Sequence, residues 1–228
     1  MSNRYQTKGI VLKRIDYGEA DRIITFFTED RGKVTVMAKG VRRPKSKLAG
    51  GIELFSVCNI GGIVGKRDID TLTSTRLETY FENIVKDYDR LQVAYDMLKL
   101  IDKMTDDDAG GDYFNLLVDS LKLLDEERAG DEVVACWFYM QSMRLNGSLP
   151  NLLEDIHGTQ LDANTCYTFS VEDGGFFKSE AGTFCADDIK AWRVFGSANT
   201  RQIKQVRGLG EPARKSLAVI KHFAEYQV

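Results

Sequence analysis

Proline and histidine are scarce in this 228-residue chain, which has three prolines and two histidines. No apolar run approaches the roughly 20 residues that a membrane-spanning helix needs, and residues 1–13 lack the apolar stretch of a signal peptide. The four cysteines lie far apart and form no C-x-x-C pair, which argues against a disulfide framework and a thioredoxin-type motif. We therefore expect a cytoplasmic protein with reduced thiols.

Signatures of catalysis are also weak. A triad would have to use His157 or His222, and no pair of carboxylates stands out among the 34 acidic residues. The glycine-rich segment 61–67 differs from a phosphate-binding loop, because Arg67 stands where a magnesium-binding Ser or Thr is needed, and we expect it to form a turn between strands. Segment 208–213 has the spacing of a dinucleotide fingerprint but follows a predicted helix, not a strand. The sequence predicts no enzyme, no catalytic residue and no cofactor.

Charge is unevenly distributed along the chain. Residues 1–50 carry twelve Lys or Arg and five Asp or Glu, whereas residues 81–228 carry sixteen and twenty-five. A basic end on a mildly acidic protein suggests that this end binds a polyanion, although a solvated charged face would give the same count.

The periodicity of apolar residues divides the chain into two parts. Up to about residue 80 the runs are short, β-branched and alternating, which predicts five strands of a small closed barrel near 7–16, 21–28, 32–39, 52–60 and 71–77. Beyond that point the spacing becomes helical. We expect α+β architecture: a barrel domain at 1–80 and an all-α domain at 81–228, with an irregular insert at 149–185.

The predicted helices have terminal signals. Asp112 and Asp131 are placed to cap two of them and to complement their N-terminal dipoles. Gly147 and Pro150 end the second of these helices, and Asp106–Asp108 form an acidic loop between helices. Three further helices are predicted at 187–195, 200–206 and 213–226.

The most specific feature is a basic loop between the third and fourth predicted strands. Glycines and a proline make it an exposed and mobile segment, and it carries Lys39, Arg42, Arg43, Lys45 and Lys47. Two further candidates, Arg22 and Lys33, lie on neighbouring strands. The aromatic residues Tyr17, Phe26 and Phe27 are candidate stacking platforms, with at least one of the two phenylalanines expected in the core.

The residues of this region resemble a known family. The motifs are TKGIVL at 7–12, DYGEADRI at 16–23, TEDRGK at 28–33 and AKGVRRPKS at 38–46, and in order and spacing they resemble the bacterial DNA repair and recombination family RecO. The resemblance implies that the barrel at 1–80 is an OB-fold DNA-binding domain. It also implies a non-enzymatic protein, associated with the nucleoid, that binds single- and double-stranded DNA and anneals complementary strands. It further implies that RecR is a partner in exchanging single-strand-binding protein for RecA. The alternatives are a scaffold whose barrel binds a protein, and a metal-dependent hydrolase.

One departure from that family concerns zinc. Many members hold a structural zinc through two C-x-x-C pairs, whereas the matching positions here are Glu154, His157, Lys178 and Ala181. Lys and Ala cannot complete a closed zinc site, and Cys166 and Cys185 are off register. We expect a degenerate subdomain without metal, held by Leu152, Leu161, Tyr167, Phe169, Phe176 and Phe177.

The last helices supply a candidate partner site. The resemblance implies binding of the acidic C-terminal tail of single-strand-binding protein, for which we single out Arg207, Arg214 and Lys215. Trp192 and Phe195 are candidate lining, although aromatic residues at this helical spacing are more often core residues. Residues 203–217 also resemble a helix-hairpin-helix, although Arg214 occupies a small-residue position and an ordinary helix pair would explain the same pattern.

Overall fold

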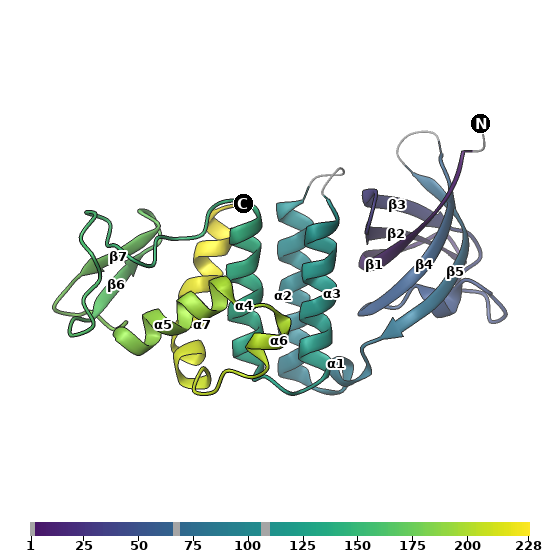
Figure 1. The fold of residues 1–228 in the computed structure, drawn as a ribbon. Helices are drawn as coiled ribbons and strands as arrows, with labels where there is room; N and C mark the ends of the chain where they lie inside the picture. Colours follow the sequence, from purple (N-terminus) through teal and green to yellow (C-terminus); the bar gives the residue numbers. More distant parts are fainter. Residues whose placement is uncertain (1–2, 66–68, 106–109) are drawn as a thin grey trace. The chain divides into compact units, whose positions relative to one another are not determined.

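The computed structural model describes residues 3–65, 69–105 and 110–228 (Figure 1). The chain divides into two compact units, Met1–Asp125 and Glu126–Val228. The first contains five strands followed by helices, as predicted for an α+β protein. The expected boundary at residue 80 marks the change from strands to helices, whereas the compact units divide 45 residues later, after Asp125. Among the described residues, no helix is both long and apolar enough to span a membrane.

The five strands of the first unit lie close to their predicted positions. They are β1 (Arg4–Tyr17), β2 (Asp21–Thr28), β3 (Gly32–Ala38), β4 (Ser56–Ile63) and β5 (Asp70–Tyr80). Their pairing follows the cyclic order β1-β2-β3-β5-β4 and returns to β1. All neighbours are antiparallel except β3 and β5, which are parallel and meet at only two residue pairs, Val36 with Asp70 and Met37 with Thr71.

Strand β4 begins four residues later than predicted. A short 3-10 turn at Ala49–Gly51 and the left-handed backbone of Phe55 (φ 58°) precede it, so the apolar residues Ile52 and Phe55 pack as loop anchors and not as strand residues. Glycines 61 and 62, predicted to form a turn, are instead paired residues of β4. Lys66 and Arg67 lie outside the described residues.

Alternation along the strands places one face inward, while the other face packs on helices in part and is exposed elsewhere. Val11, Ile24, Phe26 and Ile60 form the inner core. Phe27 points to the other face and packs on Phe114 of α3, with ring centroids 6.3 Å apart. Both phenylalanines are fully buried, which confirms the expected core placement, and neither is available as a stacking platform.

Three helices complete the first unit: α1 (Glu82–Lys86), α2 (Tyr88–Met104) and α3 (Gly111–Asp125). The short α1 was not predicted, and it is fixed by the Asp125 carboxylate, which accepts hydrogen bonds from the backbone of Asn83 and Ile84. Asp87 caps α2 by accepting from the Arg90 backbone. Asp112 lies in the first turn of α3 and not at a cap position. The predicted acidic loop at Asp106–Asp108 lies outside the described residues.

The second unit is built around α4 (Asp131–Leu145). This helix is buried on every side from Val133 to Met143, and α5 (Ala186–Ser197), α6 (Thr200–Ile203) and α7 (Gly210–Tyr226) complete the helical set of the described residues. Its buried polar side chains have hydrogen-bond partners. The Gln141 side chain donates to the Phe195 carbonyl, and the Trp137 indole donates to the Ala198 carbonyl. Gly130 occupies the N-cap position predicted for Asp131, which lies in the first turn.

An antiparallel hairpin lies between α4 and α5, so the prediction of an all-α second domain is wrong in this respect. Its strands are β6 (Tyr167–Ser170) and β7 (Gly175–Lys178), and its aromatic residues pack on Trp192 and Phe223. Of the residues predicted to hold this subdomain, four are buried: Leu152, Tyr167, Phe169 and Phe176. Burial of large aromatic rings stabilises this small region.

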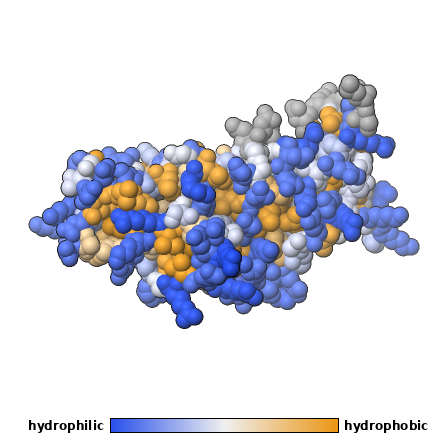
Figure 2. All heavy atoms as spheres, viewed as in Figure 1, coloured by the Kyte–Doolittle hydropathy of each residue, from blue (hydrophilic) through white to orange (hydrophobic). Residues whose placement is uncertain are grey.

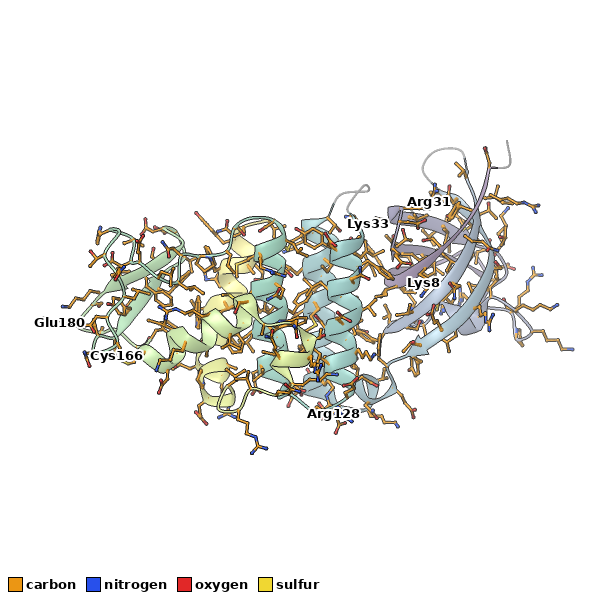
Figure 3. All side chains as sticks on the ribbon, in the orientation of Figure 1. Lys8, Arg31, Lys33, Arg128, Cys166 and Glu180 are labelled. Carbon is orange, nitrogen blue, oxygen red and sulfur yellow. A yellow bond between two sulfur atoms is a disulfide. The ribbon has the colours of Figure 1, made fainter. Side chains whose placement is uncertain are left out.

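The hairpin also carries a disulfide, so the prediction of reduced thiols is wrong for two of the four cysteines. Cys166 at the start of β6 is bonded to Cys185 at the N-cap of α5, across 19 residues (Figure 3). The flanking residues Tyr167 and Phe184 pair through two backbone hydrogen bonds, which brings the two cysteines together. Within the described residues, no group of three or more His, Cys, Asp or Glu is arranged to hold a metal ion.

Candidate nucleic-acid interface

The basic loop connects β3 to β4 and displays its cations to solvent. Lys39, Arg42, Arg43, Lys45 and Lys47 are all exposed. The loop starts at Gly40, whose φ of +65° disfavours other residues and whose backbone N–H donates to the Asp21 carboxylate at 2.6 Å. The apolar Val41 then turns inward and is 3% exposed. The chemistry that the sequence predicted, a cluster of solvent-facing cations, is therefore present.

Both ends of this loop are fastened to the strands. Near its start, the Arg42 N–H donates to the Ala20 carbonyl at 2.9 Å, and the Ser46 N–H donates to the Arg43 carbonyl at 3.0 Å to form a turn. At its end, the Thr75 hydroxyl of β5 donates to the Leu48 carbonyl at 3.1 Å. The cations are thus presented by a series of turns with fixed ends, which reduces the ordering that a ligand would have to impose.

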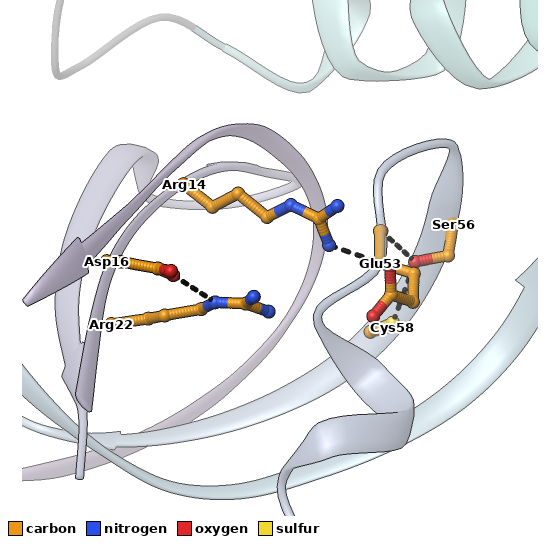
Figure 4. Close-up of polar contacts among 6 residues, drawn as sticks. All are labelled: Arg14, Asp16, Arg22, Glu53, Ser56 and Cys58. Atoms are coloured by element: carbon orange, nitrogen blue, oxygen red, sulfur yellow. Dashed lines mark hydrogen bonds and ion pairs between the residues drawn. The ribbon is translucent and has the colours of Figure 1, made fainter. Parts of the chain in front are cut away.

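One carboxylate holds two of the predicted DNA-binding residues. Asp16 on β1 accepts from Arg22 Nε at 2.7 Å (Figure 4) and lies 3.5 Å from Arg42 Nε. Hydrogen bonding by Arg22, helped by the charge of Arg42, lowers the pKa of Asp16. Lys39, Arg43, Lys45 and Lys47, in contrast, have no ion pair within the described part of the chain. The net positive potential of the loop therefore comes mainly from these four side chains.

Lys33 lies apart from this cluster. Its ammonium group donates to the Asp102 carbonyl at 2.8 Å and lies 3.7 Å from the Asp102 carboxylate, and its side chain is only 18% exposed (Figure 3). A cation is favourable here because Asp102 lies in the last turn of α2, at the negative end of the helix dipole. The structure thus gives Lys33 a role in holding α2 against the strands.

Sequence reasoning missed Arg14, which extends the charged surface along β1. Its guanidinium donates to the Glu53 carboxylate at 2.7 Å (Figure 4). The register of β1 and β2 pairs Asp16 with Arg22, and Arg14 lies two residues earlier on the same strand. Alternation along β1 was the signal that could have found it.

Hydrophilic side chains predominate on the viewed face of the strand-rich unit, with apolar groups between them (Figure 2). Tyr17 remains a candidate stacking platform, since its side chain is 54% exposed at the end of β1.

The buried thiols of Cys58 and Cys136 have raised pKa values, chiefly because burial disfavours the thiolate. They are structural residues and not nucleophiles.

In the second unit the predicted partner residues have acidic neighbours. An open hollow of about 700 Å³ is lined by Asp187, Asp188, Gly208, Glu211, Pro212, Arg214 and Lys215. Arg214 donates to Glu211 at 2.7 Å, and Lys215 pairs with Asp188, while Arg207 is exposed outside this lining.

Trp192 and Phe195 are core residues, the alternative that their helical spacing favoured, and they do not line a surface site. Both side chains are fully buried, and the Trp192 indole donates to the Ser216 hydroxyl. The resemblance to a helix-hairpin-helix is limited in the structure, because α6 has only four residues, although Gly208 has the left-handed φ of +81° expected in the hairpin.

Comparison with known proteins identifies the chain in two steps. Residues 1–81 match the family described as "Recombination protein O N terminal", which places the strand-rich part among recombination proteins. Over longer stretches the chain is similar to proteins named DNA repair protein RecO. The one from Alkaliphilus metalliredigens is 32% identical over 75% of this chain and 69% of its own length, and that from Rubrobacter xylanophilus is 34% identical over 65% and 59%. The protein from Syntrophus aciditrophicus is 27% identical over 96% and 89%. The chain belongs to the RecO family.

Proposed function

We propose that this protein acts without catalysis in DNA repair and homologous recombination by binding DNA through the basic loop between β3 and β4. The observation that carries the proposal is the group of four exposed loop cations without an ion pair within the described part of the chain, Lys39, Arg43, Lys45 and Lys47. When such side chains pair with phosphates, they displace the cations condensed on the nucleic acid, and the release of these counterions drives binding. Family membership supports DNA as the polyanion.

The five-stranded unit has the pairing order of a barrel, which favours binding of single-stranded DNA along a groove. We infer that it works as an OB-type domain, with the loop holding the phosphates and Tyr17 offering a ring to a base. Arg22 and Arg42 are both paired with the Asp16 carboxylate, which competes with phosphate for them. They can contact DNA only when a phosphate displaces this carboxylate. Annealing would follow if two strands were brought to such a surface with their bases accessible.

The proposal extends to partners through family membership. RecR and the acidic C-terminal tail of single-strand-binding protein are the partners that we propose for the exchange of that protein for RecA. Arg207, Arg214 and Lys215 stay the candidate residues for the tail. Because Arg214 and Lys215 are already paired with carboxylates, a tail peptide would have to displace Glu211 and Asp188, which predicts weak and salt-sensitive binding.

The test reverses charge in the loop. In Arg42→Glu with Arg43→Glu we expect the affinity for a fluorescent single-stranded oligonucleotide to fall at low salt, because one or two phosphate contacts are lost. The slope of log affinity against log salt should become shallower by about 0.7 per lost contact. The measurement is fluorescence anisotropy across a salt series, with melting temperature to confirm folding.

The matched control reverses two exposed lysines on α2 and α3, Lys103→Glu with Lys122→Glu. This variant has the same net charge change in the same unit and should retain the wild-type slope. If both double variants lose affinity equally, the loop is not the site and general charge explains binding. If the wild-type protein does not bind DNA at all, a scaffold function becomes the better explanation.

A further inference from the structure

The disulfide of the second unit can be reached from solvent. Cys166 and Cys185 are both partly exposed, whereas the free thiols of Cys58 and Cys136 are buried. A disulfide that an external thiol can reach exchanges in the folded protein, while a buried one opens only after local unfolding. The bridge is therefore open to thiol chemistry in the native state.

An open hollow beside the bridge gives access to one of its two cysteines. Its volume is about 550 Å³, and its lining includes Cys166, Lys178 and Glu180 but not Cys185. Cys166 and Glu180 lie close together in the hairpin region (Figure 3). A thiolate that enters this hollow meets Cys166 first, with one cation and one anion beside it.

The other cysteine is placed to leave as a thiolate. Cys185 occupies the N-cap of the 12-residue helix α5, where the positive end of the helix dipole stabilises an anion. The two carboxylates of the first turn oppose this effect, but each is paired with a lysine: Asp187 with Lys190 at 3.0 Å, and Asp188 with Lys215. A thiolate stabilised in this way is the better leaving group, so attack at Cys166 is favoured.

Non-covalent contacts keep the two sulfur atoms near each other when the bridge opens. Tyr167 and Phe184, the neighbours of the two cysteines, exchange backbone hydrogen bonds of 2.8 and 2.9 Å. Both rings are buried, and Phe184 packs on Phe176 with ring centroids 5.9 Å apart. The two thiols of the reduced protein therefore stay at a high effective concentration and can form the same bridge again.

We propose that the Cys166–Cys185 bridge is a reversible redox site whose substrate is a protein dithiol of the thioredoxin class. One thiolate of the dithiol attacks Cys166 Sγ, the Cys166–Cys185 bond breaks, and Cys185 leaves as a thiolate that takes up a proton. The second thiol of the reductant loses its proton and attacks the reductant's own sulfur in the mixed disulfide, which releases Cys166. Two electrons pass to this chain, and the reductant becomes a disulfide.

The redox state acts on the start of α5. The Asp188 carboxylate accepts from the Cys185 backbone N–H at 2.9 Å and also from the Lys215 ammonium group. Once Cys185 is no longer bonded to Cys166, the first turn of α5 is held less firmly, and with it the carboxylate that pairs with Lys215. Because Lys215 lines the hollow that also contains Arg214, reduction makes this lysine more available to an acidic ligand.

The test of the chemistry uses the native full-length protein. A thioredoxin that lacks its second cysteine should form a mixed disulfide with Cys166, identified by peptide mass spectrometry after acid quenching. With dithiothreitol, Lys178→Gln should slow reduction about twofold and Glu180→Gln should accelerate it by a similar factor, because the attacking thiolate is an anion. Lys122→Gln, which removes an exposed charge on α3, is the matched control and should leave the rate unchanged.

Hydrogen exchange measures the effect on α5. Segment 183–190 should exchange faster in the reduced protein and in Cys166→Ser with Cys185→Ser, while α4 and the Cys58→Ser control remain as in the oxidised protein. The inference is overturned if the bridge resists the dithiol until denaturant is added, or if the trapped adduct lies on Cys185. It is also overturned if segment 183–190 exchanges equally in both redox states. None of these results depends on DNA binding by the loop, so the proposed function stands or falls separately.

Discussion

At the scale of single residues, Asp16 limits the positive charge available for binding. It accepts from Arg22 and lies within ion-pair distance of Arg42, so two candidate DNA-binding side chains are partly neutralised. Removing its charge should free both guanidinium groups for phosphates. In Asp16→Asn we expect tighter binding of single-stranded DNA at low salt and a steeper log–log slope. Anisotropy titration measures both, and Glu180→Gln, an equal charge change in the second unit, is the control.

The same residue predicts a pH dependence. Its pKa is lowered in the folded protein, so its interactions with the arginines are complete above its ordinary value and are lost only as pH falls through the lowered one. The corresponding window lies below about pH 4. DNA affinity measured at pH 6 and pH 8 in the same salt should therefore show no contribution from Asp16. A difference between those pH values that disappears in Asp16→Asn would contradict this assignment.

The sequence predicts the role of a single residue when that role does not depend on residues distant in the chain. Alternation and charge counting found the exposed cations of the loop, because exposure of Lys or Arg needs no partner. They could not find that Lys33 bonds to Asp102, 69 residues away, or that Asp16 is shared by two arginines. Such contacts depend on strand register and helix placement, which the sequence pattern does not specify to one residue.

At the scale of elements, the hairpin depends on one covalent bond. The Cys166–Cys185 bridge closes a loop that contains both β6 and β7, and the strands themselves are only four residues each. Constraining a loop of this length stabilises a fold by about 3 kcal/mol in the chain-entropy account. In dithiothreitol, or in Cys166→Ala with Cys185→Ala, we expect a lower melting temperature, measured by circular dichroism.

A chelator provides the contrast to that experiment. It should leave the melting temperature unchanged, because Lys178 and Ala181 stand at two positions where a zinc site would need ligands. Cys58→Ala is a control for loss of a thiol outside the bridge. Equal melting of oxidised and reduced protein would mean that the aromatic cluster around Trp192 alone holds the hairpin.

Helices and strands were predicted where periodicity is strong and missed where it is short. The five strands and the long helices follow from alternation and from 3.6-residue spacing. The five-residue α1 and the four-residue strands β6 and β7 are too short for a period to be visible. The disulfide was missed for a related reason, since cysteines 19 residues apart reveal no pairing until the hairpin brings their neighbours together.

At the scale of the whole molecule, the two compact units do not coincide with the change from strand to helix. Helices α2 and α3 belong with the strands, because Tyr95 packs edge-to-face on Phe55 at 5.0 Å and Phe114 packs on Phe27. The change of periodicity near residue 80 therefore predicted a change of secondary structure and not the boundary of a folding unit. Sequence periodicity alone does not reveal which strands a helix covers.

This division predicts how fragments behave. Residues 126–228 should fold cooperatively on their own, with a sharp thermal transition and a strong near-ultraviolet aromatic signal from the Trp192 cluster. A fragment of residues 81–228 should show additional helix that melts without cooperativity, because removal of Phe27 and Phe55 exposes the apolar faces of α2 and α3. Calorimetry and circular dichroism measure both. A single sharp transition that includes all helices of 81–228 would place the boundary at residue 80.

The boundary after Asp125 leaves the two proposed binding regions on consecutive units of one chain. Because the units are consecutive segments of one chain, a strand held by the loop at Lys39–Lys47 and a peptide held near Arg214 would each encounter the other as a tethered reactant. Short tethers give effective concentrations in the millimolar range. Two weakly bound ligands would therefore meet on one molecule at an effective concentration far above their concentrations in free solution.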